Sequence, residues 1–275
     1  MSSVSVATAR EQRITVPSLA RRKQRGERIS MLTAYDFSFA RIFDSAGIDV
    51  LLVGDSLGNV VQGQPTTLPV TLDDVVYHTR LVARGARRSL VVADLPFGSY
   101  QVSAEEAVRA AVRCLKDGGA HAVKLEGGQR MADTIERIAG AEIPVMGHVG
   151  LTPQAIHRMG GHRVQGRDPA SRARVLADAR AVEQAGAFAI VLEGMPAELA
   201  REITSALSIP TIGIGAGVHC DGQVLVMHDL LGLSEWTPSF AKQYAGLGSL
   251  ASQAARAFAE DVGHGKFPDR EHSYR

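Results

Sequence analysis

The sequence predicts an α/β protein, a (β/α)8 TIM barrel with parallel strands, a short N-terminal helix and a long C-terminal helix. Short apolar runs alternate with helical segments along almost the whole chain of 275 residues, as in right-handed βαβ units. The runs are almost continuously apolar, which is typical of parallel strands buried on both faces. Eight such units within about 250 residues favour a closed barrel over an open sheet.

The expected elements follow the apolar runs and the residues that begin and end helices. We expect strands at residues 29–34, 50–53, 90–93, 121–125, 144–147, 188–192, 211–214 and 224–227. We expect helices at residues 17–24, 37–45, 72–85, 104–117, 131–139, 170–184, 196–207 and 238–262. Thr71 with Asp74, and Ser103 with Glu106, have the spacing of capping boxes. The last two strands are too close in sequence for a crossover helix, so the seventh unit is expected to be abbreviated.

Composition and charge narrow the class of protein. A net charge of +1 and a single basic cluster at residues 21–25 argue against a nucleic-acid partner. Cys114 and Cys220 are too few for a disulfide framework, which favours a reducing cytoplasm. No apolar run is long enough for a transmembrane helix. We expect residues 1–15 to be disordered and residues 16–275 to form a single catalytic barrel domain.

Five consecutive apolar strands each lead to an ionisable residue. These residues are Asp55, Asp94, Glu126, His148 and Glu193. A carboxylate is costly in a core, whereas the C-terminal ends of the strands are where barrel enzymes carry their active sites. We therefore expect the five side chains to line one site.

Three of these residues, Asp55, Asp94 and Glu126, come from neighbouring strands and would repel one another unless a cation lies between them. Oxygen ligands favour a hard divalent ion, Mg²⁺ before zinc. For any one of the three, the alternative is a helix cap or a structural ion pair.

The other polar positions each allow two interpretations. Lys124 lies two residues before Glu126 and points to the same side of its strand, so it binds an anionic substrate or pairs with Asp94 or Glu126. Glu193, among apolar neighbours, suits a general base, with a fourth metal ligand or an ion pair as the alternative. His148 is either functional or structural. The glycines at residues 213–217 do not fit the dinucleotide fingerprint and would either admit a ligand or form a tight turn.

A metal, a lysine and a separate base together indicate proton abstraction next to a carbonyl. The metal would chelate a 2-oxo acid and stabilise its enolate. The residues by themselves do not identify the electrophile.

Nine stretches, in order, resemble the ketopantoate hydroxymethyltransferases from about Ile29 to Tyr274. They are TAYDFSFAR, LLVGDSLGNVVQG, TLPVTLDDVVYHTR, ADLPFGSY, GGAHAVKLEGG, PVMGHVGLTPQ, GAFAIVLEGMP, IPTIGIGAG and CDGQVLVMHDLLGL. The resemblance implies a (β/α)8 barrel, dependence on Mg²⁺ and the first committed step of pantothenate biosynthesis. In that step 3-methyl-2-oxobutanoate receives a hydroxymethyl group from 5,10-methylenetetrahydrofolate and becomes 2-dehydropantoate through a Mg-stabilised enolate.

The same resemblance implies roles for individual residues. Asp55 and Asp94 would bind the metal, with Glu126 completing the coordination directly or through a water. Glu193 matches the proton acceptor. The implied substrate-binding residues are Asp55, Ser56, Asp94, Lys124 and His148. The family also implies a cytoplasmic homo-oligomer, commonly a decamer.

Two other functions stay open on the sequence. A Mg-dependent carbon–carbon lyase or a phosphoenolpyruvate mutase-type enzyme shares the barrel, the acidic mouth and the enolate chemistry, and a folate requirement would separate the two. A non-catalytic metabolite-binding or assembly barrel is disfavoured because every site position of the family is filled. A non-catalytic barrel of this kind would be expected to lack Asp55 or Glu193.

Overall fold

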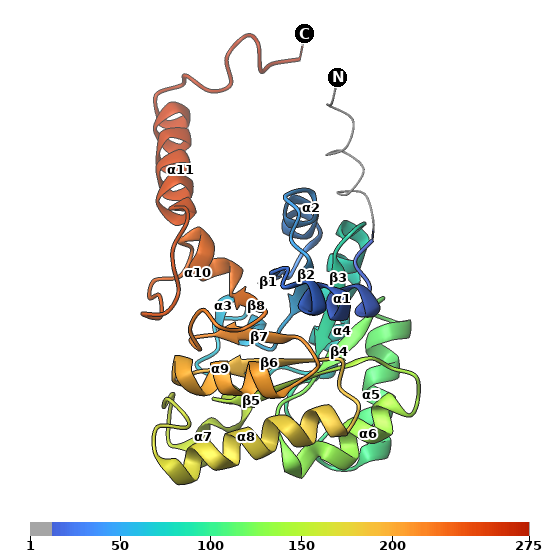
Figure 1. The fold of residues 1–275 in the computed structure, drawn as a ribbon. Helices are drawn as coiled ribbons and strands as arrows, with labels where there is room; N and C mark the ends of the chain where they lie inside the picture. Colours follow the sequence, from blue (N-terminus) through green and yellow to red (C-terminus); the bar gives the residue numbers. More distant parts are fainter. Residues whose placement is uncertain (1–12, 275) are drawn as a thin grey trace, which may run out of the picture. The chain divides into compact units, whose positions relative to one another are not determined.

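The strands of the computed structural model form one closed barrel, as the sequence predicts. The structure describes residues 13–274. All eight strands are parallel and pair in chain order, and β8 closes the barrel against β1 (Figure 1). Of residues 1–15, which were predicted to be disordered, residues 1–12 lie outside the described residues, whereas residues 13–15 are placed. Ile14 is buried, and its N–H donates to the carbonyl of Arg88.

The strand bounds lie close to those predicted. The strands are β1 (Ile29–Thr33), β2 (Val50–Val53), β3 (Leu90–Asp94), β4 (Ala122–Lys124), β5 (Val145–Gly150), β6 (Ala189–Glu193), β7 (Thr211–Ile214) and β8 (Gly222–Leu225). The largest difference is in β5, which continues to Gly150 because its backbone keeps pairing with β6 as far as Glu193. His148 therefore lies inside a strand and not after it.

Alternate strand residues fill the interior of the barrel. They belong to one buried apolar cluster that contains Ile29, Met31, Val50, Leu52, Leu90, Val92, Ala122, Met146, Ala189, Val191, Ile212 and Val224. Leu19 of α1 (Val16–Arg25) and Ile14 join the same cluster, so the N-terminal segment covers the N-terminal end of the barrel. Apolar packing fills the barrel interior at that end, whereas polar side chains occupy the interior at the C-terminal ends of the strands.

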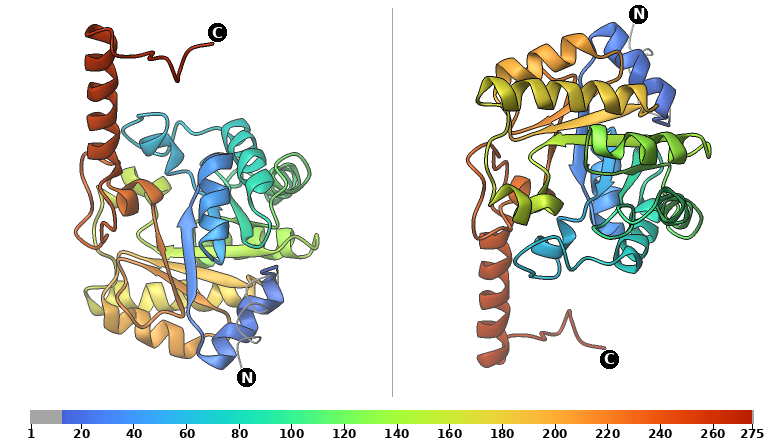
Figure 2. Two further views of the ribbon diagram at one scale, coloured as in Figure 1. Left: turned by 90° about the horizontal axis from the view of Figure 1, so that it is seen from above. Right: turned by 90° about the horizontal axis from the view of Figure 1, so that it is seen from below.

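Helices surround the barrel. They are α2 (Phe37–Ser45), α3 (Leu57–Val60), α4 (Leu72–Gly85), α5 (Ala104–Lys116), α6 (Ala132–Ala139), α7 (Ile156–Met159), α8 (Pro169–Gln184) and α9 (Ala197–Ala206), with 3-10 helices η2 (Gln129–Met131) and η3 (Pro153–Ala155). Neighbouring helices pack against each other, as α8 and α9 do in Figure 2. Thr71 and Asp74 form the predicted capping box of α4. Residues 215–221, between β7 and β8, contain no helix, as the short spacing predicts.

The chain divides into two compact units, one up to Val226 and one from Met227 onward, whereas the sequence suggested a single domain. The second unit contains α10 (Met227–Leu231) and α11 (Leu247–Gly263). The predicted start of the last helix at residue 238 is wrong. The N–H groups of Tyr244 and Ala245 donate to the carbonyl of Leu230, so this stretch folds back along α10 before the helix begins. No residue of α11 is buried.

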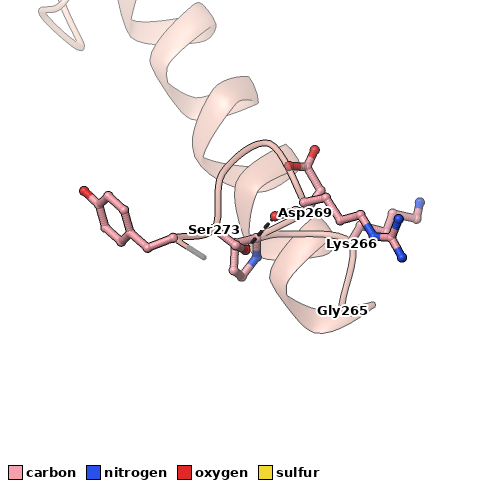
Figure 3. Close-up of a pocket in the computed structure, with 7 residues that line it drawn as sticks. Gly265, Lys266, Asp269 and Ser273 are labelled. Carbon is pink, nitrogen blue, oxygen red and sulfur yellow. Dashed lines mark hydrogen bonds between the residues drawn. The ribbon is translucent and has the colours of Figure 1, made fainter.

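The C-terminal unit also contains a cavity of about 770 Å³. Figure 3 shows that a turn near the chain end forms it, where the Ser273 hydroxyl donates to the carbonyl of Asp269 at 2.6 Å. Its lining residues are exposed and include none of the predicted site residues, so we interpret it as the space inside a surface turn. Across residues 13–274, no helix has both the length and the apolar character needed to cross a membrane.

Candidate active site

The site continues the interior rows of the barrel. Four polar residues, Asp94, Lys124, His148 and Glu193, stand two residues after Val92, Ala122, Met146 and Val191 of the apolar cluster. Because side chains alternate between the two faces of a strand, these four lie on the interior side. Glu126 follows Lys124 by another two residues, and Asp55 lies just beyond the end of β2. The structure thus brings the predicted residues to one end of the barrel.

Lys124 and Asp94 form a buried ion pair. The Lys124 Nζ atom lies 2.8 Å from Asp94 Oδ1, and the two residues are 4% and 1% exposed. Burial raises the pKa of Asp94, Lys124 opposes this only in part, and the charges of Asp55 and Glu126 add to it, so that the pKa reaches about 7. Burial alone would lower the pKa of Lys124, but the surrounding carboxylates raise it. The lysine is therefore a fixed cation among an excess of acids.

His148 lies between two carboxylates. Its Nδ1 atom is 3.5 Å from Glu126 Oε1, and its Nε2 atom is 3.1 Å from Glu193 Oε2. Burial and Lys124 disfavour a charged imidazole, but the two carboxylates outweigh them and raise the pKa of His148 to about 9. Glu193 is the most accessible of these acids, with 16% of its side chain exposed. The imidazole can therefore orient Glu193 while leaving it open to a ligand.

Gln154 and Tyr100 connect the acids, and the sequence analysis missed both. The Gln154 side chain donates to Asp55 Oδ2 at 3.0 Å, and its backbone N–H donates to Glu126 Oε2 at 3.1 Å. The Tyr100 hydroxyl donates to Gln154 Oε1 at 2.7 Å, and both residues are buried. Gln154 lies in η3, in the segment between β5 and α8, and nothing in its spacing in the sequence indicates that its side chain points inward.

Ser56 lies at the edge of this network. Its hydroxyl is 2.8 Å from the hydroxyl of Tyr35, whereas the backbone N–H of the adjacent Asp55 donates to Asp94 Oδ2 at 3.3 Å. The glycine run enters a bend at residues 215–216, directly after β7. Gly217 has a φ of 78°, and a Cβ atom there would lie 2.4 Å from the Cβ of Ala197.

The chemistry of the site fits a hard divalent cation. Among residues 13–274, the four carboxylates meet Lys124 and His148 as their cationic groups, so negative charge is in excess. The backbone N–H of Asp55 donates to the Asp94 carboxylate, whereas the carboxylates of Asp55 and Glu126 are both hydrogen-bonded to Gln154. Within the part of the chain that the structure describes, no three His, Cys, Asp or Glu side chains already stand in an ion-holding arrangement. The fit therefore rests on the oxygen chemistry of the donors and on the excess of negative charge.

Sequence comparison relates nearly the whole chain to one family. The profile of the ketopantoate hydroxymethyltransferase family matches residues 13–270. The 3-methyl-2-oxobutanoate hydroxymethyltransferase of Syntrophotalea carbinolica is 56% identical over 265 residues, which are 96% of this chain and 99% of that protein. The enzyme of the same name from Pelobacter propionicus is 54% identical over 264 residues, which are 96% of this chain and 98% of that protein.

Solved structures share the fold at low sequence identity. A 2,3-dimethylmalate lyase of the PEP mutase/isocitrate lyase superfamily superposes with a TM-score of 0.61 at 18% identity, covering 94% of this chain and 92% of that one. A phosphonopyruvate hydrolase in complex with oxalate and Mg²⁺ gives a TM-score of 0.62 at 12% identity, covering 94% and 93%. Since the sequence matches extend over nearly the full length, the chain belongs to the ketopantoate hydroxymethyltransferase family and is a transferase of pantothenate biosynthesis.

Proposed function

We propose that the chain transfers a hydroxymethyl group from 5,10-methylenetetrahydrofolate to 3-methyl-2-oxobutanoate. One water is consumed, and 2-dehydropantoate and tetrahydrofolate leave. The observation that carries this proposal is the division of the site by His148. Its Nδ1 side faces Lys124 and Glu126, and its Nε2 side faces Glu193. One part can thus bind an anionic keto acid while a separate carboxylate moves a proton, as enolate formation requires.

Asp55 and Asp94 would hold Mg²⁺. Glu126, which is connected to Asp55 through Gln154, would be the more distant acid. When bound, the ion supplies Lewis acidity to the keto and carboxylate oxygens of the substrate. The all-oxygen donor set supports this choice of metal, as does the phosphonopyruvate hydrolase of the same fold, which is complexed with oxalate and Mg²⁺. Lys124 would offer a fixed positive charge to the substrate carboxylate. Ser56, next to Asp55, would add a hydroxyl donor.

Glu193 would accept the proton from C3 of the substrate. The C3–H bond breaks, its electron pair forms the enolate, and the proton passes to the carboxylate. His148 holds that carboxylate from 3.1 Å away. The enolate carbon then bonds to the folate-borne methylene carbon, and the hydroxyl oxygen of one water bonds to the same carbon while both of its bonds to folate nitrogens break. The proton taken from C3 and the second proton of the water go to the two nitrogens, so that tetrahydrofolate leaves. Holding both reactants in one site supplies the positioning that this step needs.

Other features of the family are proposals for this chain. We expect a homo-oligomer, commonly a decamer in the family, which analytical ultracentrifugation would measure. A cytoplasmic location is consistent with two free, buried thiols, Cys114 and Cys220.

A transfer assay tests the proposed function. The purified chain with 3-methyl-2-oxobutanoate, Mg²⁺ and 5,10-methylenetetrahydrofolate should form 2-dehydropantoate, and omission of either the folate or the metal should abolish the product. EDTA treatment followed by addition of Mg²⁺ or Zn²⁺ checks the metal preference. Cleavage of a 2-hydroxy acid without folate, and no transfer with it, would instead favour the lyase alternative.

A further inference from the structure

We propose that the cavity next to Glu126 binds the folate co-substrate and that three arginines on its rim bind the glutamyl carboxylates. This inference rests on the proposed function. The cavity has a volume of about 750 Å³, within the ~300–1,000 Å³ range of small-molecule sites. It is formed by the segments after β4 and β5 together with η3, α7 and α8, all within the barrel unit.

The cavity adjoins the acids of the site. Tyr100, Glu126 and Gln154 belong both to its wall and to the hydrogen-bond network around Asp55. Gly150 of β5 also lines it and is the register partner of Glu193 in β6. A Cβ atom at Gly150 would lie 2.2 Å from the Glu193 carbonyl oxygen, so the two strands approach closely here. The cavity thus extends to the backbone of the strand that carries the proton acceptor, although Glu193 itself does not line it.

Three arginines give the rim its charge. Arg130, Arg158 and Arg174 line the cavity and are exposed. None of them forms an ion pair with another described residue, whereas Arg172, also on α8, pairs with Glu202 at 2.5 Å. Guanidinium groups bind carboxylates with two parallel hydrogen bonds. Three unpaired guanidinium groups around one cavity therefore favour a ligand that carries carboxylates, as the glutamyl part of a folate does.

The walls suit the flat ring system of a reduced folate. Phe97, which is 50% exposed, offers an aromatic face, and Met131 and Met159 offer polarisable surface. Asp178 also lines the cavity, and its Oδ1 atom accepts the backbone N–H of Gln129 at 3.0 Å. No described residue engages its other oxygen, which is free to accept N–H groups of a pterin ring. The apolar, acidic and basic parts of the cavity thus match the parts of one ligand.

The test uses the full chain and tetrahydrofolates that carry one or five glutamyl groups. Arg130, Arg158 and Arg174 are changed to Gln, singly and together. Arg180→Gln, on the same helix α8 but outside the cavity, is the matched control. The triple variant should bind the five-glutamyl form about tenfold or more weakly in calorimetry, and it should lose any preference for that form over the one-glutamyl form. Affinity for 3-methyl-2-oxobutanoate and the unfolding midpoint should not change.

Failure of this inference can be distinguished from failure of the proposed function. The measurement is exchange of the substrate C3 proton in D₂O, with and without tetrahydrofolate. If the triple variant binds both folates like the wild type and exchange is normal, the cavity is not the folate site and the proposed function stands. If the wild type neither exchanges the C3 proton nor binds either tetrahydrofolate, the proposed function and this inference fail together.

Discussion

The two ends of the barrel use buried carboxylates in opposite ways. At the N-terminal end, Asp49 precedes β2 and meets Arg22 at 2.7 Å and Arg88 at 2.8 Å. At the C-terminal end, Asp94 has one cation, Lys124, and two carboxylate neighbours. Burial acts to raise both pKa values. Hydrogen bonds from Ser30 and Arg88 and the charge of Arg22 nevertheless lower the pKa of Asp49, whereas the pKa of Asp94 rises to about 7.

This difference indicates which end is built for stability and which for function. Near the N-terminal ends of the strands, Asp221 pairs with Lys23 at 2.7 Å, and Asp44 accepts the backbone N–H groups of Arg88 and Ser89. Each acid there has its own partners. The C-terminal acids are crowded beyond what their partners neutralise, which costs stability and is typical of a binding site. The charge balance thus locates the site independently of the family.

The largest expected effect at the C-terminal end is on turnover. Glu193→Gln should lower kcat by about 10²–10⁴-fold, because only the proton acceptor is removed. Affinities for Mg²⁺ and 3-methyl-2-oxobutanoate, measured by calorimetry, should stay near the wild-type values, and so should the unfolding midpoint. Wild-type turnover in this variant would exclude Glu193 as the base.

A matched pair of substitutions compares how much one buried carboxylate at each end contributes to the unfolding free energy. Asp49 and Asp55 are similarly buried, at 4% and 6% exposure. Asp49→Asn should lower the unfolding free energy by about 2–3 kcal/mol, because two arginines lose their counter-charge. Asp55→Asn should leave it unchanged or higher without metal, because Asn still accepts from Gln154 while a charge beside Asp94 disappears. Urea unfolding in the presence of EDTA measures the unfolding free energy of both variants. An equal decrease in the two variants would contradict the proposed difference between the two ends.

A substitution of Gln154 should have a smaller effect at the C-terminal end, on the affinity for the metal. Gln154→Leu keeps a similar volume but removes the donor to Asp55 and the acceptor for Tyr100. Affinity for Mg²⁺ should fall about 10–100-fold, as for other residues that orient a metal ligand. Electron paramagnetic resonance with Mn²⁺ as the probe would measure this without turnover. An unchanged metal affinity together with a lower unfolding midpoint would show that the glutamine only supports the fold.

The smallest effect is a pH dependence at the N-terminal end. The pKa of Asp49 is lowered from its ordinary value of 3.8, so its stabilisation is complete above that value and is lost as the pH falls through the lower folded pKa. The unfolding free energy of the wild type should therefore drop on acidification below about pH 4, by at most about 1.4 kcal/mol per pH unit from this group. Asp49→Asn should show a shallower acid slope in urea titrations, and parallel slopes would contradict the assignment.

The sequence predicted the barrel well because each strand is a short apolar run whose boundaries are visible. It also predicted the strand-end acids, since Asp94 and Glu193 stand where continuous apolar runs end. Gln154 and Tyr100 were missed because each reaches the site from a connecting segment, and no periodicity indicates where such a side chain points. The start of α11 was wrong for a related reason. Backbone hydrogen bonds from residues 244 and 245 to Leu230 override the local helical pattern.

The central claim is that Glu193 removes the C3 proton of a keto acid held at Asp55, Asp94 and Lys124. The most direct measurement is exchange of the C3 proton of 3-methyl-2-oxobutanoate in D₂O, followed by NMR with Mg²⁺ and without folate. We predict exchange that requires both the wild-type chain and Mg²⁺ and that is lost in Glu193→Gln. Absence of exchange in the wild type, even after tetrahydrofolate is added, would contradict the claim.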